Sequence, residues 1–191
     1  MAKILFESTR GFDQIAIEDI FLKNRKIFLT EEVNAATMDD IIKQVMYLEE
    51  DDPSGEITFF INSPGGSVSS GLALYDMLMH VRCPIRTVCI GLAASMGAIL
   101  FLAGDKREIM AHGQIMVHDP SFGRMDVGGL KPHEIQQQVD SLNETKEAIA
   151  KIIAERTGKS IKAVYKVTAN DTFFNAEKAL EYGLATSIIR D

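Results

Sequence analysis

The chain has 191 residues, of which 46% are hydrophobic and 25% are charged, and its formal net charge is −7. This length predicts one domain, or one domain with a small appendage, and it is sufficient to bury a sizeable core. The acidic balance and the lack of a basic cluster argue against nucleic-acid binding. No apolar run approaches the roughly 18 residues of a membrane span, and no secretory signal is expected at the start of the chain.

The two cysteines, Cys83 and Cys89, flank a short predicted strand. We interpret them as buried free thiols, which is typical of a reducing, cytoplasmic environment. The sequence has no Cys/His cluster with zinc spacing and no glycine-rich loop that ends in Gly-Lys-Ser/Thr. We therefore expect neither a metal nor a bound cofactor.

Strands alternate with helices in the first half of the chain. Residues 1–19 have weak periodicity and are predicted to form a mobile or partner-dependent arm. The elements expected after this arm are a strand at 26–29, a helix at 37–50, a strand at 57–61 and a helix after the turn 63–67. The strand at 57–61 is continuously apolar, as in a parallel sheet that is buried on both faces. This alternation implies right-handed βαβ crossovers and an α/β fold.

The middle of the chain carries three more predicted strands. The first, at 85–90, precedes a run of small residues and a helix that opens at Ser95. The other two, at 107–110 and 114–118, are predicted to pair as a hairpin around the turn 111–113.

A long helix is the main predicted feature of the last third. The polar segment 119–131 reads as a loop, Pro132 suits the first turn of the helix, and Gly158 suits its C-terminal end. The remaining predicted elements are two short helices and a strand, at 160–167, 175–183 and 184–189.

Ser95 is the first candidate for chemistry. It lies in the small-residue run Gly91–Gly97, where the predicted helix begins. Unpaired backbone N–H groups and the positive end of the helix dipole meet there. Such a serine is either a helix N-cap or a nucleophile beside an anion site, and position alone favours the cap.

Three other features favour the nucleophile. His118 is the last residue of a predicted strand, and the residues after it end the strand pairing, so its ring can project into a site. The alternative is a surface histidine. Gly65 and Gly66 follow a buried strand and allow close approach of a ligand, or simply form a tight turn. Asp171 lies beside two aromatic residues, where partial desolvation suits a carboxylate that orients a histidine, although a loop or capping role is the alternative.

Four motifs, taken together and in this order, resemble the ClpP family, the proteolytic subunits of the Clp ATP-dependent protease. The resemblance covers about residues 20–190. Its motifs are Ile-Asn-Ser-Pro-Gly-Gly-Ser at 61–67, Gly-Leu-Ala-Ala-Ser-Met-Gly-Ala at 91–98, Met-Val-His at 116–118, and Asn-Ala-Glu through Glu-Tyr-Gly-Leu at 175–184.

The resemblance implies an α/β fold built as a crotonase-like ββα superhelical spiral. It implies one peptidase domain at 20–191, with a protruding helical handle at about 119–158 and an N-terminal arm, 1–19, that lines an axial pore as a loop.

The resemblance also implies the roles of the site residues. Ser95 is the implied nucleophile, His118 the general base, and Asp171 the group that orients the imidazole. The backbone N–H groups of Gly66 and Met96 are the implied oxyanion hole. The implied activity is serine endopeptidase hydrolysis of unfolded polypeptides to short peptides.

The implied assembly is a tetradecamer of two stacked heptameric rings with the active sites in an inner chamber. The implied partner is an AAA+ Clp unfoldase, which uses ATP while this chain binds none. No nucleic acid or membrane is implied. Asp119 stands where the family usually has glutamine and Asn170 where it often has arginine. This pattern indicates a divergent paralogue, whose rings are homomeric or mixed with a second subunit.

Two other classes of function remain open at this point. The first is a weakly active or non-catalytic ring subunit that needs an active paralogue, which peptide hydrolysis alone and in mixture distinguishes. The second is an acyl-CoA enzyme of the crotonase superfamily, which binding of a CoA thioester would support.

Overall fold

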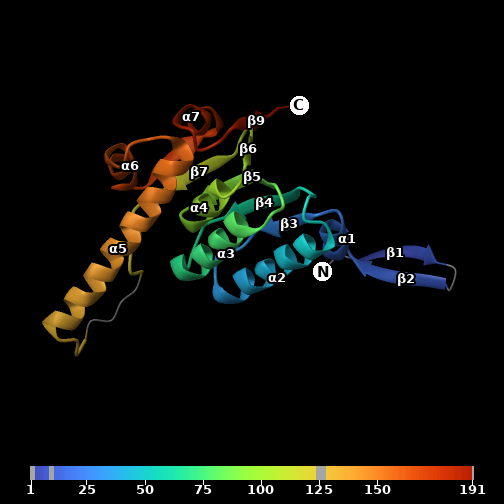
Figure 1. Ribbon diagram of the computed structural model, residues 1–191, viewed down its shortest axis with the longest axis horizontal. Helices are drawn as coiled ribbons and strands as arrows, with labels where there is room; N and C mark the ends of the chain where they lie inside the picture. Colours follow the sequence, from blue (N-terminus) through green and yellow to red (C-terminus); the bar gives the residue numbers. More distant parts are fainter. Residues whose placement is uncertain (1–2, 9–10, 124–127, 191) are drawn as a thin grey trace.

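The computed structural model describes residues 3–8, 11–123 and 128–190 and consists of a mostly parallel sheet covered by helices (Figure 1). The strands of the main sheet are β3 (Lys26–Leu29), β4 (Ile57–Ser63), β5 (Ile85–Ala94), β6 (Lys106–Met110), β7 (Gln114–Val117), β8 (Thr172–Asn175) and β9 (Ser187–Ile189). The helices are α1 (Ile17–Lys23), α2 (Ala35–Asp51), α3 (Val68–His80), α4 (Met96–Leu102), α5 (Pro132–Thr157), α6 (Ile161–Thr168) and α7 (Ala176–Tyr182).

The sheet has the order β3-β4-β5-β6-β9, and all of these neighbours are parallel. β4 lies between two parallel strands and is buried along most of its length, as its apolar sequence predicts. Together with the helices that connect the strands, this arrangement confirms the α/β fold.

The predicted hairpin at 107–118 is wrong. β6 pairs with Arg86–Cys89, in the first half of β5, and β7 pairs with Leu92–Ala94, in the second half. Both strands are therefore parallel to β5 and follow one another along the same edge. The reason is that β5 does not end at Ile90 as predicted. Its small residues stay extended to Ala94, so the strand has a second length of unpaired edge with which β7 can pair.

Two further elements were not predicted. β8 pairs antiparallel with β7, with Thr172 opposite Val117, and α1 begins at Ile17 within the predicted arm. The last strand, β9, starts at Ser187 and is shorter than predicted. These elements are three to seven residues long, too short for a clear hydrophobic period.

The N-terminal segment forms a hairpin of β1 (Lys3–Ser8) and β2 (Gly11–Ala16) that projects from the body of the molecule (Figure 1). Residues 1–2 and 9–10 of the predicted arm lie outside the described residues. The role of the arm as an axial loop stays a prediction.

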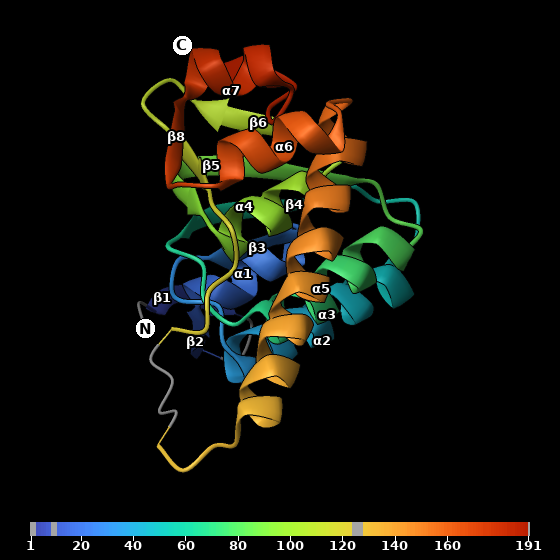
Figure 2. The ribbon, with the colours of Figure 1, turned by 90° about the vertical axis from the view of Figure 1, so that its left-hand side faces the viewer.

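Helix α5 is the predicted long helix. It starts at Pro132 and ends at Gly158, which adopts the left-handed conformation with φ 70°. Its last turns pack against α4 and α6, and its first turns project away from the sheet (Figures 1 and 2). Residues 124–127 of the predicted handle lie outside the described residues.

Helix α4 is the best-covered element of the fold, since every one of its residues is buried. It follows β5 directly, so the junction between them, at Ser95, is held between the sheet and the core. Cys83 and Cys89 are buried and unpaired, which confirms their interpretation as free thiols. In the described part of the chain, no helix is long and apolar enough to cross a membrane.

Candidate active site

Ser95 joins β5 to α4 in a backbone conformation that residues other than glycine rarely adopt. Its φ is 52° and its ψ is −122°. The main chain is held there because the Ser95 N–H donates to the carbonyl of Met116 at 2.9 Å and the Ser95 carbonyl accepts from the N–H of Ala98 at 3.0 Å. Strain of this kind persists only where the surroundings enforce it, and it clusters at functional sites.

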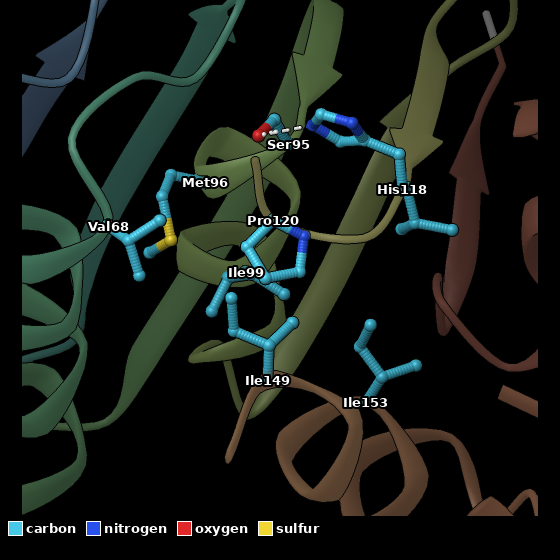
Figure 3. Close-up of a pocket in the computed structure, with 9 residues that line it drawn as sticks. Val68, Ser95, Met96, Ile99, His118, Pro120, Ile149 and Ile153 are labelled. Carbon is cyan, nitrogen blue, oxygen red and sulfur yellow. Dashed lines mark hydrogen bonds between the residues drawn. The ribbon is translucent and has the colours of Figure 1, made fainter. Parts of the chain in front are cut away.

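The side chain of Ser95 does not cap α4. Its Oγ lies 2.8 Å from Nε2 of His118 instead (Figure 3). This geometry overturns the capping alternative. A hydroxyl that donates to a neutral imidazole is set to lose its proton to that ring.

His118 follows β7 directly, and the strand pairing explains its position. Ala94 at the end of β5 lies opposite Met116 of β7, so the residues that follow these two strands meet at the same edge of the sheet. In the tautomer whose lone pair on Nε2 accepts from the hydroxyl, the ring proton is on Nδ1, which faces Asp171.

Asp171 lies on the far side of the histidine ring. Its Oδ1 is 3.4 Å from Nδ1 of His118. The position follows from β8, because Thr172 pairs with Val117 and brings the preceding carboxylate beside the residue after Val117. The structure thus brings together the three side chains that the family resemblance implies.

The predicted desolvation of Asp171 is wrong. Its side chain is 65% exposed, and Phe173 is 54% exposed. In a strand, alternate side chains point to opposite faces, so Phe173 and Phe174 do not both cover the carboxylate. The Asp171 carboxylate therefore contacts His118 from a solvent-exposed position.

The turn at Gly65 and Gly66 lies against the Ser95 junction. A Cβ on Gly65 would lie 2.7 Å from Cβ of Ser95 and 2.8 Å from the amide nitrogen of Met96. Both glycines have positive φ, 90° and 146°. Only glycine combines that conformation with so close an approach.

Within the described part of the chain, two backbone N–H groups remain free to face a ligand at this junction. Val33 donates to the carbonyl of Gly65 and accepts from the N–H of Ser67, so the N–H of Gly66 between them points away from Val33. Met96 is the first residue of α4, and the first N–H groups of a helix have no partner within it. Both predicted oxyanion donors therefore lie in the Gly65–Ser95 contact region.

An apolar pocket opens beside the serine and the histidine (Figure 3). It is lined, besides Ser95 and His118, by Val68, Met96, Ile99, Val117, Pro120, Ile149 and Ile153. Three of these come from the start of α3 and the last turns of α5, far from Ser95 in the sequence. Sequence reasoning missed them because each reads only as an apolar position on a helix face.

The buried thiol on the same strand is not an alternative nucleophile. Cys89 lies on β5 and is fully buried, and this burial raises the pKa of its thiol to about 11. It therefore stays protonated and unreactive near neutral pH. Among residues 3–8, 11–123 and 128–190, no three side chains of His, Cys, Asp or Glu gather as metal ligands would. The absence of a cofactor stays a prediction.

An α/β protein with a serine, a histidine and a carboxylate in line beside an apolar pocket has the arrangement of a serine hydrolase. The family model for the Clp protease matches residues 9–191. The chain therefore belongs to the Clp protease family, which confirms the resemblance found in its motifs. The match begins before residue 20, so it includes β2 and α1 as well as the predicted peptidase domain.

Proposed function

We propose that this protein is a serine endopeptidase that hydrolyses unfolded polypeptides to short peptides. The observation that supports the proposal most directly is the 2.8 Å separation between Ser95 Oγ and His118 Nε2, at a strained strand–helix junction. Family membership supports a protease of the Clp type.

In the proposed first half-reaction, His118 Nε2 takes the proton of Ser95 as Oγ attacks the peptide carbonyl. Asp171 holds the ring with its other proton on Nδ1 and stabilises the imidazolium that forms. The N–H groups of Gly66 and Met96 receive the charge that develops on the carbonyl oxygen. The imidazolium then protonates the leaving amine, which leaves an ester on Ser95.

In the second half-reaction, His118 deprotonates a water molecule that attacks the ester. The carboxyl product leaves and the hydroxyl of Ser95 is restored. The pocket beside Ser95 accepts an apolar side chain of the substrate, since its walls carry few polar atoms apart from the reacting groups.

We propose the same assembly that the resemblance implies, two stacked heptameric rings that work with an AAA+ unfoldase. Apolar side chains that remain exposed in the single chain support an assembled state. They include Met46 and Tyr47 on α2, Phe28 on β3, and Ile135 and Val139 on α5. The unfoldase uses ATP, and this chain uses none.

One observation favours a second candidate, a subunit that is weakly active by itself. The Asp171 carboxylate is 65% exposed and stands 3.4 Å from His118, longer than a good hydrogen bond. In this second candidate, contact with an active paralogue would bring the Asp171 carboxylate closer to His118. The acyl-CoA alternative gains no support from the family match.

Intact-mass analysis after treatment with a serine-reactive fluorophosphonate tests the proposal. We expect one adduct on the wild-type chain and none on Ser95→Ala. Ser69→Ala is the matched control, because this serine is exposed on α3 and its hydroxyl contacts Ser67 rather than a histidine, so the variant should label like wild type. A wild-type chain that takes no adduct alone but does so when mixed with an active paralogue would select the second candidate.

The apolar lining of this pocket leads to a separate prediction about specificity. Val68→Phe adds bulk to the wall formed by α3. Cleavage after leucine or methionine should fall about 10- to 100-fold in kcat/KM, as expected when a pocket loses room for a few methylene groups. A peptide with alanine at the same position is the internal control and should be affected least. Equal losses for all three peptides would mean that this pocket does not hold the side chain next to the cleaved bond.

A further inference from the structure

Asp119, the residue after His118, is held by two helices. Its backbone N–H donates to the carbonyl of Thr168, at the end of α6, with a length of 2.7 Å. Its carboxylate accepts from Nζ of Lys146 on α5 at 2.5 Å. The same ammonium group lies 5.2 Å from the centre of the Tyr165 ring on α6. A carboxylate next to the histidine is therefore neutralised by a lysine.

The ion pair is more sheltered than a typical surface pair. The side chains of Lys146 and Asp119 are 37% and 27% exposed, whereas both members of the Lys151–Glu147 pair on the same helix are 58% exposed. Exposed pairs contribute little because solvent screens them and because two long side chains must be ordered. Because the pair is partly buried and the Tyr165 ring lies beside Lys146, the two side chains are held in one arrangement.

The segment that Asp119 fixes contains two parts of the candidate site. His118 precedes it and makes the 2.8 Å contact to Ser95, and Pro120 follows it and forms a wall of the apolar pocket. A shift of Asp119 would therefore displace both His118 and the pocket wall that Pro120 forms. Since the contact of the His118 ring to Asp171 is long, at 3.4 Å, the main chain on the C-terminal side of His118 contributes to the orientation that its contact to Ser95 requires.

We propose that Asp119 is a positioning residue for the reaction and that Lys146 of the long helix holds it in place. The pair couples the orientation of the His118 ring to the position of α5. This inference rests on the proposed function, since it takes His118 as the base. A neutral side chain at position 119 would have no charge to pair with the lysine.

The test compares Lys146→Met and Asp119→Asn with the wild-type assembly. Both changes should lower kcat and the rate of fluorophosphonate labelling about tenfold, since small misplacements of reacting groups are costly. KM and Tm should change little. Lys146→Arg keeps the charge and should recover most of the rate, and Lys151→Met, which breaks the exposed pair on the same helix, should leave it unchanged.

The double variant Asp119→Asn, Lys146→Met separates coupling from two independent effects. If the residues act through each other, the double variant should be no slower than either single variant. Additive losses, a wild-type rate in Lys146→Met, or an equal loss in Lys151→Met would overturn the proposal. If Lys146→Met does not fold, Lys146→Gln is measured instead against the same criteria. Labelling of wild-type Ser95 in the same experiment distinguishes failure of this inference from failure of the proposed function.

Discussion

Replacing His118 with glutamine is expected to lower kcat for peptide hydrolysis by roughly 10⁴- to 10⁶-fold, the range seen when a serine hydrolase loses its base. Glutamine can still hydrogen-bond to Ser95 Oγ, but its amide does not accept a proton near neutral pH. The hydroxyl is then a weak nucleophile. The measurement is hydrolysis of a fluorogenic peptide by the assembled protein, together with the fluorophosphonate labelling rate of Ser95.

His112→Gln is the matched control for this experiment. His112 is exposed in the turn between β6 and β7, six residues before His118, and has no contact with Ser95. It should keep the wild-type rate. If His118→Gln retained more than about a hundredth of the wild-type kcat, the ring would not act as the general base, whatever its distance from the serine.

The sequence predicted some residues of this site better than others. Ser95 and His118 lie in two of the motifs, and the parallel pairing of β5 with β7 accounts for their meeting. Asp171 lies outside the motifs and was implied only by the family resemblance. Asp171 depends on β8, a four-residue strand without a readable period. Its high exposure also escaped prediction, because sequence neighbours do not say which face of a strand they cover.

The errors in the fold have one common cause, which is that strand partners are chosen by tertiary structure. The segments at 107–110 and 114–118 are close in sequence and separated by a turn, which is the local pattern of a hairpin. In the structure, the free edge of β5 binds both of them in succession. The pairing of Asp119 with Lys146 was hidden for the same reason, since 26 residues of chain separate them and only the packing of α5 brings them together.

The residues that line the apolar pocket could not be predicted from local sequence patterns. Val68, Ile149 and Ile153 have no feature that distinguishes them from other core positions of α3 and α5. Their role depends on the crossing of α5 over the end of α4, which is a property of the assembled layers. The family resemblance thus identified the reacting groups, whereas the residues that form the walls of the pocket became apparent only in the structure.

Gly66→Ala is expected to lower kcat by about 10²- to 10³-fold, equivalent to the loss of one oxyanion donor. The φ of Gly66 is 146°, and a Cβ there would lie 2.3 Å from the carbonyl oxygen of Val33. That oxygen cannot withdraw easily, because it accepts the N–H of Ser67 at 2.8 Å. The turn must therefore shift relative to Ser95 and carry the Gly66 N–H out of place.

Gly129→Ala is the control that separates the clash from backbone strain alone. Gly129 also has a positive φ, 81°, but a Cβ there meets nothing within 4 Å. It should therefore leave kcat close to wild type, even if it lowers Tm slightly. Wild-type kcat in Gly66→Ala would remove this N–H from the oxyanion hole and leave the N–H of Met96 as the remaining predicted donor. A loss in Gly66→Ala with Ser95 and His118 still in contact would instead assign the lost catalysis to charge stabilisation, because the nucleophile and its base are unchanged in that variant.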